Sequence, residues 1–275
     1  MPHTFTRIVL AISALVLFAG CGNKQEQQSQ QDQGETDALV AEAVEFKGPP
    51  IIQDMIAAHG GMDAWKNAPT FSFTDQWGDN PPTTFVVEQG RRRAYFDIAG
   101  TDVAVAWDGE KAWSMNWPTQ TPVRFLALLN YYFINIPWLT QDPGVVLGEP
   151  GAGTLPNDPT QYVTVMMTFQ PGTGDTPDDY YRLYIDPQSK MLHAVDYIVT
   201  YRALLDEGEK STPEHCLIYD EMTTVDGLKV PAHFTIYEAG NVYAACTLSN
   251  YSLSTPFDEA RMTMPEGAVI DTSTP

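Results

Sequence analysis

The stretch VRFLALLNYYFINIPWL, residues 123–139, decides the fold class, because it is apolar on every side when it is drawn as a helix. Arg124, Asn130 and Asn135 are its only strongly polar residues. A membrane span needs about 18 or more apolar residues, and Arg124 and Pro137 bracket roughly a dozen. The stretch therefore predicts a helix that is buried on all sides within a folded protein.

The ends of this helix are expected from its flanking residues. Thr121 suits the N-cap, and Pro122 suits the first helical position. A proline disfavours helical geometry in the residue before it, so Pro137 predicts that the helix ends near Asn135.

Most of the remaining chain alternates apolar and polar residues in short runs, which is typical of β-strands. Turn signals such as Asp108-Gly109 separate the runs, and hairpin-length links make the strands antiparallel. We expect about ten or eleven strands, a loop over residues 151–159, a short helix over residues 51–59 and a tail that covers a sheet edge. The predicted fold class is α+β, mainly β: an antiparallel half-barrel wrapped around the buried apolar helix.

Composition limits the classes of function. The chain has 275 residues, of which 43% are hydrophobic, which is enough for one sizeable core. Its formal net charge of −20 argues against nucleic acid, whose phosphates would be repelled, and against electrostatic docking on anionic lipid. Such acidity suits a soluble exported protein.

Residues 1–20 have the pattern of a secretory signal peptide, with Arg7, an apolar run and small residues before Cys21. The string LFAGC, residues 17–21, resembles a bacterial lipobox, a signal in which the cysteine is lipidated and becomes the mature N-terminus. Gly22 after the cysteine resembles the sorting pattern for the outer membrane. The alternative is an ordinary signal peptide followed by a chance cysteine.

Residues 21–48 are predicted to be a lipidated cysteine followed by a flexible Gln-rich tether. Residues 22–34 contain six glutamines and almost no apolar side chain, so they cannot bury enough surface to offset the entropy of ordering. The expected organisation is a lipoprotein signal peptide over residues 1–20, the lipidated cysteine and tether over residues 21–48 and a half-barrel domain over residues 49–275.

Two cysteines, Cys216 and Cys246, remain in the predicted domain. Their expected strands are separated by one other strand, which places them about 9.5 Å apart. Disulfides rarely tolerate more than about 7 Å between Cα atoms. We expect the two thiols to be unpaired. The alternative is a disulfide between them, which a different strand register would allow.

Candidate groups for catalysis or metal binding are few. The sequence has no Gly-x-Ser-x-Gly elbow, phosphate-binding glycine loop or His-Glu-x-x-His pattern. His59 is interpreted as a packing or capping residue, and the acidic turn with Asp175, Asp178 and Asp179 as solvated rather than as a Ca²⁺ site. An enzyme would need His59 or His233 to meet carboxylates in a cleft. We therefore predict a protein that is not an enzyme, without catalytic residues, cofactor or metal.

The apolar material exceeds what one flat sheet can cover, because Trp65, Trp107, Trp113 and Trp138 add to the buried helix. A sheet that curls around the helix would cover them. It would leave either a hydrophobic cavity between helix and sheet or a filled core. The residues alone leave these two outcomes open.

Five strings carry a family resemblance: IIQDMIAAHGGMDAW (51–65), YYFINIPWLTQDPGV (131–145), FQPGTGDTPDD (169–179), LYIDP (183–187) and VDGLKVP (225–231). In this order and spacing they resemble bacterial lipoproteins of the LolA/LolB superfamily, which include an uncharacterised group of predicted outer-membrane lipoproteins. The resemblance implies an antiparallel half-barrel over helices, with a hydrophobic cavity that accepts acyl chains. It carries over no catalytic residue.

Six residues of the buried helix are expected to line or gate such a cavity: Phe125, Leu128, Leu129, Tyr132, Phe133 and Trp138. The expected function is that of a membrane-anchored periplasmic lipoprotein that binds a lipid acyl chain or another apolar ligand, in lipoprotein or lipid trafficking. Lipidated Cys21 would hold it at the outer membrane, facing the periplasm, and no protein partner is indicated. The alternative is a non-enzymatic envelope interaction module with a filled core.

Overall fold

The computed structural model describes residues 46–156 and 158–275. The predicted signal peptide, Cys21 and the tether up to residue 45 lie outside the described residues. These described residues belong to one compact unit. No helix in the described part of the chain is long and apolar enough to cross a bilayer.

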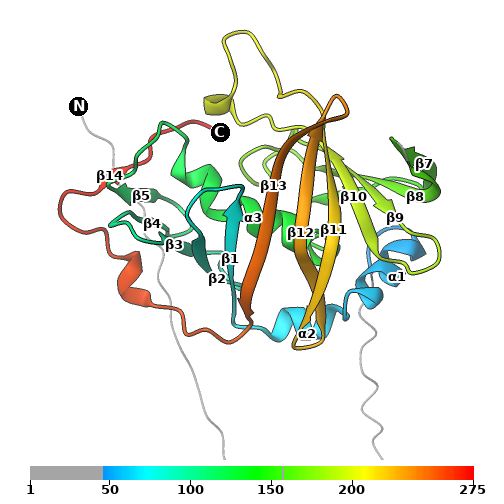
Figure 1. Cartoon of the computed structure of the whole chain (residues 1–275), viewed down its shortest axis with the longest axis horizontal. Coiled ribbons are helices and arrows are strands. Elements are labelled where there is room, and N and C mark those ends of the chain that lie inside the picture. Colours follow the sequence, from blue (N-terminus) through cyan, green and yellow to red (C-terminus); the bar gives the residue numbers. More distant parts are fainter. Residues whose placement is uncertain (1–45, 157) are drawn as a thin grey trace, which may run out of the picture. The chain divides into compact units, whose positions relative to one another are not determined.

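The described residues form one open, antiparallel 14-stranded sheet with the order β14-β5-β4-β3-β2-β1-β13-β12-β11-β10-β9-β8-β6, in which β7 pairs with β8 (Figure 1). The strands are Thr70–Trp77 (β1), Thr83–Glu88 (β2), Ala94–Ile98 (β3), Ala104–Trp107 (β4), Ala112–Met115 (β5), Val145–Leu147 (β6), Gly151–Leu155 (β7), Asp158–Phe169 (β8), Tyr181–Ile185 (β9), Leu192–Tyr197 (β10), His215–Val225 (β11), Leu228–Glu238 (β12), Asn241–Ser252 (β13) and Val269–Ile270 (β14). The predicted mainly β, antiparallel half-barrel fold is confirmed, with more strands than expected.

The sheet curves around one long helix, α3 (Val123–Leu139). This helix contacts β2, β3, β4 and β5, and it also contacts β12, which lies three strands beyond β2 in the sheet. One helix can touch strands so far apart only when the sheet bends around it. The main apolar core therefore lies between α3 and the inner face of the sheet.

The C-terminal end of α3 differs from the prediction. The helix continues through Pro137 to Leu139, whereas the sequence placed its end near Asn135. Pro137 has no N–H, so the carbonyl of Phe133, four residues earlier, lacks its helical donor. The Tyr219 hydroxyl on β11 donates to that carbonyl at 2.6 Å. This tertiary hydrogen bond offsets the loss, and local reasoning about proline could not include it.

The N-terminus of α3 is capped from the far end of the chain. Pro122 occupies the N-cap without a side-chain cap bond, so the predicted cap at Thr121 is wrong by one position. The Asp271 carboxylate instead accepts the backbone N–H of Arg124 at 2.9 Å. A carboxylate is favoured there because it faces the positive end of the helix dipole.

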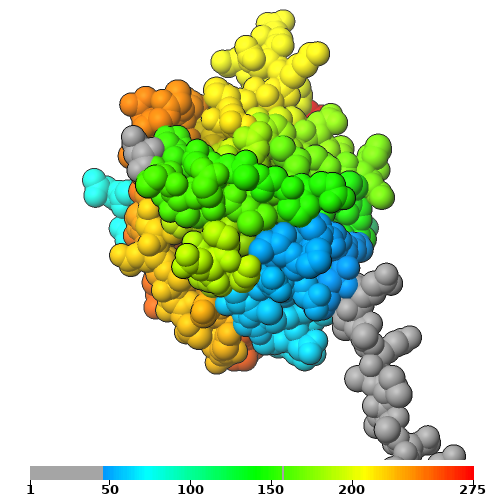
Figure 2. All heavy atoms as spheres, turned by 90° about the vertical axis from the view of Figure 1, so that its right-hand side faces the viewer, coloured from blue at the N-terminus to red at the C-terminus, as the bar shows by residue number. Residues whose placement is uncertain are grey.

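Two short helices, α1 (Pro50–Ala58) and α2 (Met62–Asn67), precede the sheet, and α1 agrees with the helix predicted over residues 51–59. In Figure 2, α1 is blue and α2 is light blue to cyan, and the two lie next to each other on the body. As expected, Trp65 points into the core. Its indole N–H donates to the Asn135 side chain at 2.7 Å, and its ring stacks on Trp138 with centroids 6.2 Å apart.

Two strands depart from the sequence-based expectation. β7 lies within residues 151–159, which were interpreted as a loop, because its Gly-Ala-Gly start carries no apolar alternation. β14 has only two residues, Val269 and Ile270, and pairs with β5 at the edge of the sheet. The tail therefore covers a sheet edge, as predicted.

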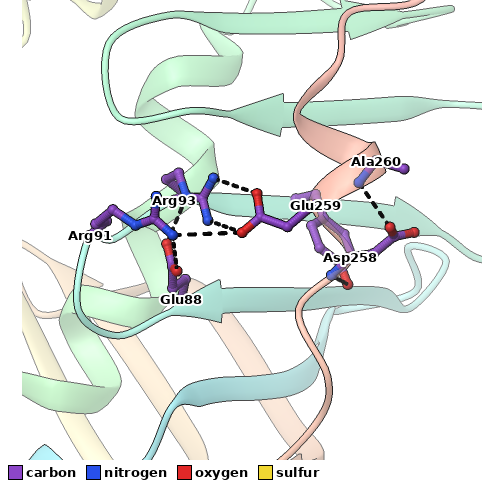
Figure 3. Close-up of polar contacts among 7 residues, drawn as sticks. Glu88, Arg91, Arg93, Asp258, Glu259 and Ala260 are labelled. Carbon is purple, nitrogen blue, oxygen red and sulfur yellow. Dashed lines mark hydrogen bonds and ion pairs between the residues drawn. The ribbon is translucent and has the colours of Figure 1, made fainter.

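The tail also crosses the outer face of the sheet. Phe257 and Met262, the latter in the 3₁₀ turn η2 (Glu259–Met262), pack against a second apolar cluster on that face. Figure 3 shows the ion pairs that fasten this turn, in which Arg93 contacts Glu88 and Glu259, each at 2.6 Å. The tail is thereby joined to the β2–β3 turn.

The two cysteines of the domain are unpaired, as predicted. Cys216 is on β11 and Cys246 on β13, with β12 between them. Cys246 is buried in the main core, whereas Cys216 packs beside a smaller apolar cluster. Between β10 and β11 the chain forms the 3₁₀ turn η1 (Arg202–Leu204) and an acidic loop that projects from the body, yellow in Figure 2.

Candidate ligand cavity

A cavity of about 760 Å³ lies beside α3. One wall is a face of α3, and the other is built by β6, β8, β9 and the segment after β10. The turns β2–β3, β4–β5 and β8–β9 and the residues after α3 contribute to its rim. Ligand-binding pockets commonly have volumes of about 300–1,000 Å³, so the space suffices for a small molecule.

Helical spacing explains the α3 wall. The apolar lining residues from this helix are Phe125, Leu128, Leu129, Tyr132, Phe133, Ile136 and Leu139. With 3.6 residues per turn, they fall within roughly 80° of Phe125 around the helix axis. Five of the six residues expected to line a cavity are in this set.

The sixth expected residue, Trp138, lies elsewhere. It is roughly 140° from Phe125 around the helix. Its side chain is 0% exposed, and its indole N–H donates to the Gly61 carbonyl at 2.9 Å. Trp138 thus fixes the packed side of α3 and does not line the cavity.

Sequence reasoning missed two lining residues, Ile136 and Leu139, because it ended the helix at Asn135. The signal was present, since Leu128, Tyr132 and Ile136 are spaced at i and i+4. Sequence reasoning also missed the opposite wall, which depends on how the sheet curves. That wall is apolar and aromatic, and its members are Val145, Met167, Phe169, Tyr181, Val199 and Tyr201.

Two ion pairs lie at the rim. Arg124, in the first turn of α3, pairs with Asp175 of the β8–β9 turn through its Nε at 2.7 Å and also through Nη2. Arg92, of the β2–β3 turn, pairs with Asp142, which follows α3. Both arginines and both aspartates line the cavity. The cavity is therefore apolar along its walls and charged at its rim.

The acidic turn does not gather its carboxylates. Asp175 pairs with Arg124, and Asp179 accepts hydrogen bonds from the Thr200 backbone and hydroxyl, each at 2.7 Å. Burial raises the pKa of Asp179. Among residues 46–156 and 158–275, no group of three His, Cys, Asp or Glu side chains is arranged to hold a metal ion.

The two histidines weighed for catalysis lie away from the cavity lining. His59 is buried at the end of α1, where its Nδ1 is 2.8 Å from the Met55 carbonyl. Burial lowers its pKa to about 4, so it is neutral at pH 7 and packs edge-on against Trp138. His233 lies 2.9 Å from Asp220 on strands β12 and β11. Neither residue lines the cavity.

No family profile and no curated protein matches this chain. Three solved structures are similar in fold. A LolA superfamily protein from Nitrosomonas europaea has 10% identity and a TM-score of 0.46, covering 78% of this chain and 96% of that one. A DUF1329 family protein from Desulfovibrio piger has 9% identity and a TM-score of 0.45, with coverage of 78% and 96%.

The third structure is a putative outer membrane lipoprotein-sorting protein domain from Vibrio parahaemolyticus, with 7% identity, a TM-score of 0.45 and coverage of 77% and 94%. TM-scores below 0.5 at such identities carry no conclusion about a ligand, which has to be inferred from the cavity itself.

Proposed function

We propose that this protein binds a lipid acyl chain, or another apolar ligand of similar shape, in the cavity beside α3. The observation that supports the proposal is a cavity of about 760 Å³ with apolar side chains on both walls. The cavity is open to solvent at its rim, so the apolar surface of its walls stays in contact with water unless a ligand covers it. A space of this size between apolar walls is better suited to holding a ligand than to stabilising an empty fold.

The driving force would be burial of apolar surface. Each methylene transferred from water contributes about 0.8 kcal/mol, so a chain of ten or more methylenes can outweigh the cost of association, of about 4–15 kcal/mol, only when most of it is buried. The two walls supply such an environment, because Leu129 and Ile136 face the cavity from one side and Met167 and Phe169 from the other.

The proposed place of action is the periplasmic side of the outer membrane, where the protein would serve lipid or lipoprotein trafficking. The secretory pattern of residues 1–20 and the lipobox-like string before Cys21 support this part. The proposed role is binding rather than catalysis. The other hypothesis, an interaction module with a filled core, is disfavoured by the volume of the cavity.

The test is native mass spectrometry, with organic extraction, of residues 22–275 produced without the signal segment and Cys21. The expected result is a bound lipid that is released on denaturation, or uptake of an offered fatty acid or phospholipid. A clean ligand-free mass that persists in the presence of these lipids would overturn the proposal.

A further inference from the structure

Arg124 is held at the cavity rim by contacts to three separate segments. The Asp271 carboxylate from the tail accepts its backbone N–H at 2.9 Å. Its guanidinium carbon lies 4.9 Å from the centre of the Trp107 ring, an arrangement favoured by the cation–π interaction. Its Nε and Nη2 both contact the carboxylate of Asp175. The guanidinium is therefore pre-positioned, and its planar fork matches a carboxylate.

The carboxylate that now occupies this fork belongs to a turn that can release it. Asp175 lies between β8 and β9, after Gly172 and Gly174, which have positive φ angles of 80° and 65°. No atom lies within 4 Å of where a Cβ would be on either glycine, whereas Thr173 between them packs against Gly144, so release of Asp175 is a local movement of its side chain and not an opening of the whole turn. The Asp175 side chain is 34% exposed, so it can move into water.

In the second rim pair the carboxylate is less exposed. Asp142 is 20% exposed, and the Lys47 ammonium donates to its backbone carbonyl at 3.1 Å. Arg92 lies over the Tyr132 ring, 5.9 Å from its centre. Of the two arginines, Arg124 is thus the one whose partner is easier to replace.

We infer that the ligand is an amphiphile with an acyl chain and a terminal carboxylate, of the fatty-acid class, and that its carboxylate replaces Asp175 on Arg124. The inference rests on the proposed function, since the chain would lie along the apolar face of α3. This face begins at Arg124, because Phe125 and Leu128 follow it directly into the cavity. Asp175 would then act as an internal stand-in for the carboxylate of the ligand.

The charges at the rim favour an anionic head over a cationic one. Two of the four acidic lining residues, Asp142 and Asp175, pair with arginines, and buried Asp179 accepts hydrogen bonds from Thr200. Only Glu110 remains for a cation among the acidic lining residues. The net charge of −20 repels an anion at long range, and this repulsion is screened beyond about 8 Å at 0.15 M salt.

The test compares three ligands with the same chain: dodecanoate, dodecanol and dodecyltrimethylammonium. Binding to residues 22–275 is measured by calorimetry at pH 7.5 below the micelle-forming concentrations. We expect dodecanoate to bind about tenfold more tightly than dodecanol, since a charge-assisted bidentate hydrogen bond is added. Arg124→Met should remove this preference, and Arg182→Met, whose arginine pairs with Asp196 outside the cavity lining, should keep it.

Asp175→Asn gives the sharpest result, because the two partners of one ion pair should have opposite effects. Freed of its competitor, Arg124 should bind dodecanoate about threefold or more tightly than in the wild type, with dodecanol unchanged. If Asp175 only held the turn in place and no head group were recognised, Asp175→Asn would instead change the affinity for dodecanoate and dodecanol equally. Asp175→Asn changes only one exposed turn residue, so it remains informative if Arg124→Met does not fold.

Several outcomes would overturn the inference. These are equal affinities for dodecanoate and dodecanol, tighter binding of dodecyltrimethylammonium, or weaker dodecanoate binding in Asp175→Asn. Failure of all three ligands to bind would count against the proposed function itself. Binding of dodecanol without a preference for dodecanoate would leave the proposed function standing and reject only the carboxylate site.

Discussion

The two sides of α3 contrast in how they are held. On the packed side, polar side chains tie the helix to two other segments, α2 with its N-cap and β1, through the pairs Asn135–Trp65, Trp138–Gly61 and Asn130–Asp75. On the cavity side, apolar residues such as Phe125 and Leu129 face open space, and polar contacts are confined to the rim. A helix that is apolar all round in sequence is therefore fixed on one side and free to contact a ligand on the other.

Buried amide side chains therefore identify the side of such a helix that is packed against the rest of the fold. A buried polar group without a partner costs about 1–3 kcal/mol, so it occurs where the fold supplies one. Asn135 has both its donor and its acceptor satisfied, by the Tyr131 carbonyl at 2.8 Å and the Trp65 indole at 2.7 Å. The cavity side, whose lining from α3 is mainly apolar, has no such requirement.

The largest expected effect is on the packed side. Trp138→Ala should lower the free energy of unfolding by about 3–5 kcal/mol, because it leaves a void where the indole is 0% exposed. The matched variant on the other side, Phe125→Ala, should cost about 1 kcal/mol or less, because its ring already borders the cavity. Urea unfolding followed by circular dichroism measures both. Equal losses would break the contrast between the two sides.

A smaller effect is expected at the Asp75–Asn130 contact. Burial raises the pKa of Asp75 to about 6 from 3.8, so the folded state binds the proton more tightly than the unfolded state. Stability from this group is therefore fully present below pH 4 and is lost as the pH rises through 6. Asp75→Asn should raise the free energy of unfolding by about 2 kcal/mol at pH 8 and by little at pH 4.

The urea midpoints of the wild type and of Asp75→Asn, each at pH 4 and pH 8, measure this difference in stability. The Asn130 Oδ1 has no hydrogen-bond partner among the described residues, so the new amide could donate to it. His59, whose pKa is lowered to about 4, contributes stability above pH 6.5 that is lost toward pH 4. Because His59 is present in both the wild type and Asp75→Asn, its contribution cancels in the difference between their stabilities. A variant that is no more stable at pH 8 would contradict the assignment.

On the cavity side, a charge should affect binding more than folding. Leu129→Asp places a carboxylate against the proposed acyl chain, and its desolvation should weaken lipid binding by about tenfold or more. The control Val242→Asp changes a residue that is 65% exposed on β13 and outside the lining. Lipid content is measured by extraction and mass spectrometry. Unchanged occupancy in folded Leu129→Asp would count against the cavity as the site.

The smallest expected effect concerns the tail. Asp271→Ala removes the carboxylate that caps α3 and should lower the free energy of unfolding by about 1 kcal/mol. Asp206→Ala, in the acidic loop, serves as the control and should change it by less than about 0.5 kcal/mol. Thermal unfolding distinguishes the two. Identical values would show that the tail does not support the helix end.

Much of the fold follows from local patterns. The apolar stretch that forms α3, the helix before Gly60 and the position of Trp65 were all predicted, because each depends on short-range spacing. The end of α3 was not, because it depends on a hydrogen bond from Tyr219, 86 positions away in the chain. The Asp271 cap, 147 positions from Arg124, could not be predicted for the same reason.

The candidate site also has one part that could be predicted from local sequence patterns and one part that could not. The α3 wall was mostly predicted, since periodicity places Phe125, Leu129 and Tyr132 on one face. The opposite wall, with Met167 and Tyr181, depends on sheet curvature that no local pattern encodes. Trp138 was assigned to the wrong side, because a run that is apolar all round does not show which of its faces is packed.

The most direct test of the cavity as the ligand site is photo-crosslinking with a diazirine-bearing fatty acid, followed by peptide mapping. The proposed site predicts labels on two separated segments, residues 125–139 of α3 and residues 167–181 of the opposite wall, and loss of both on competition with unlabelled fatty acid. Labels confined to the exposed apolar residues Val242, Tyr243 or Val269, with neither wall modified, would contradict it.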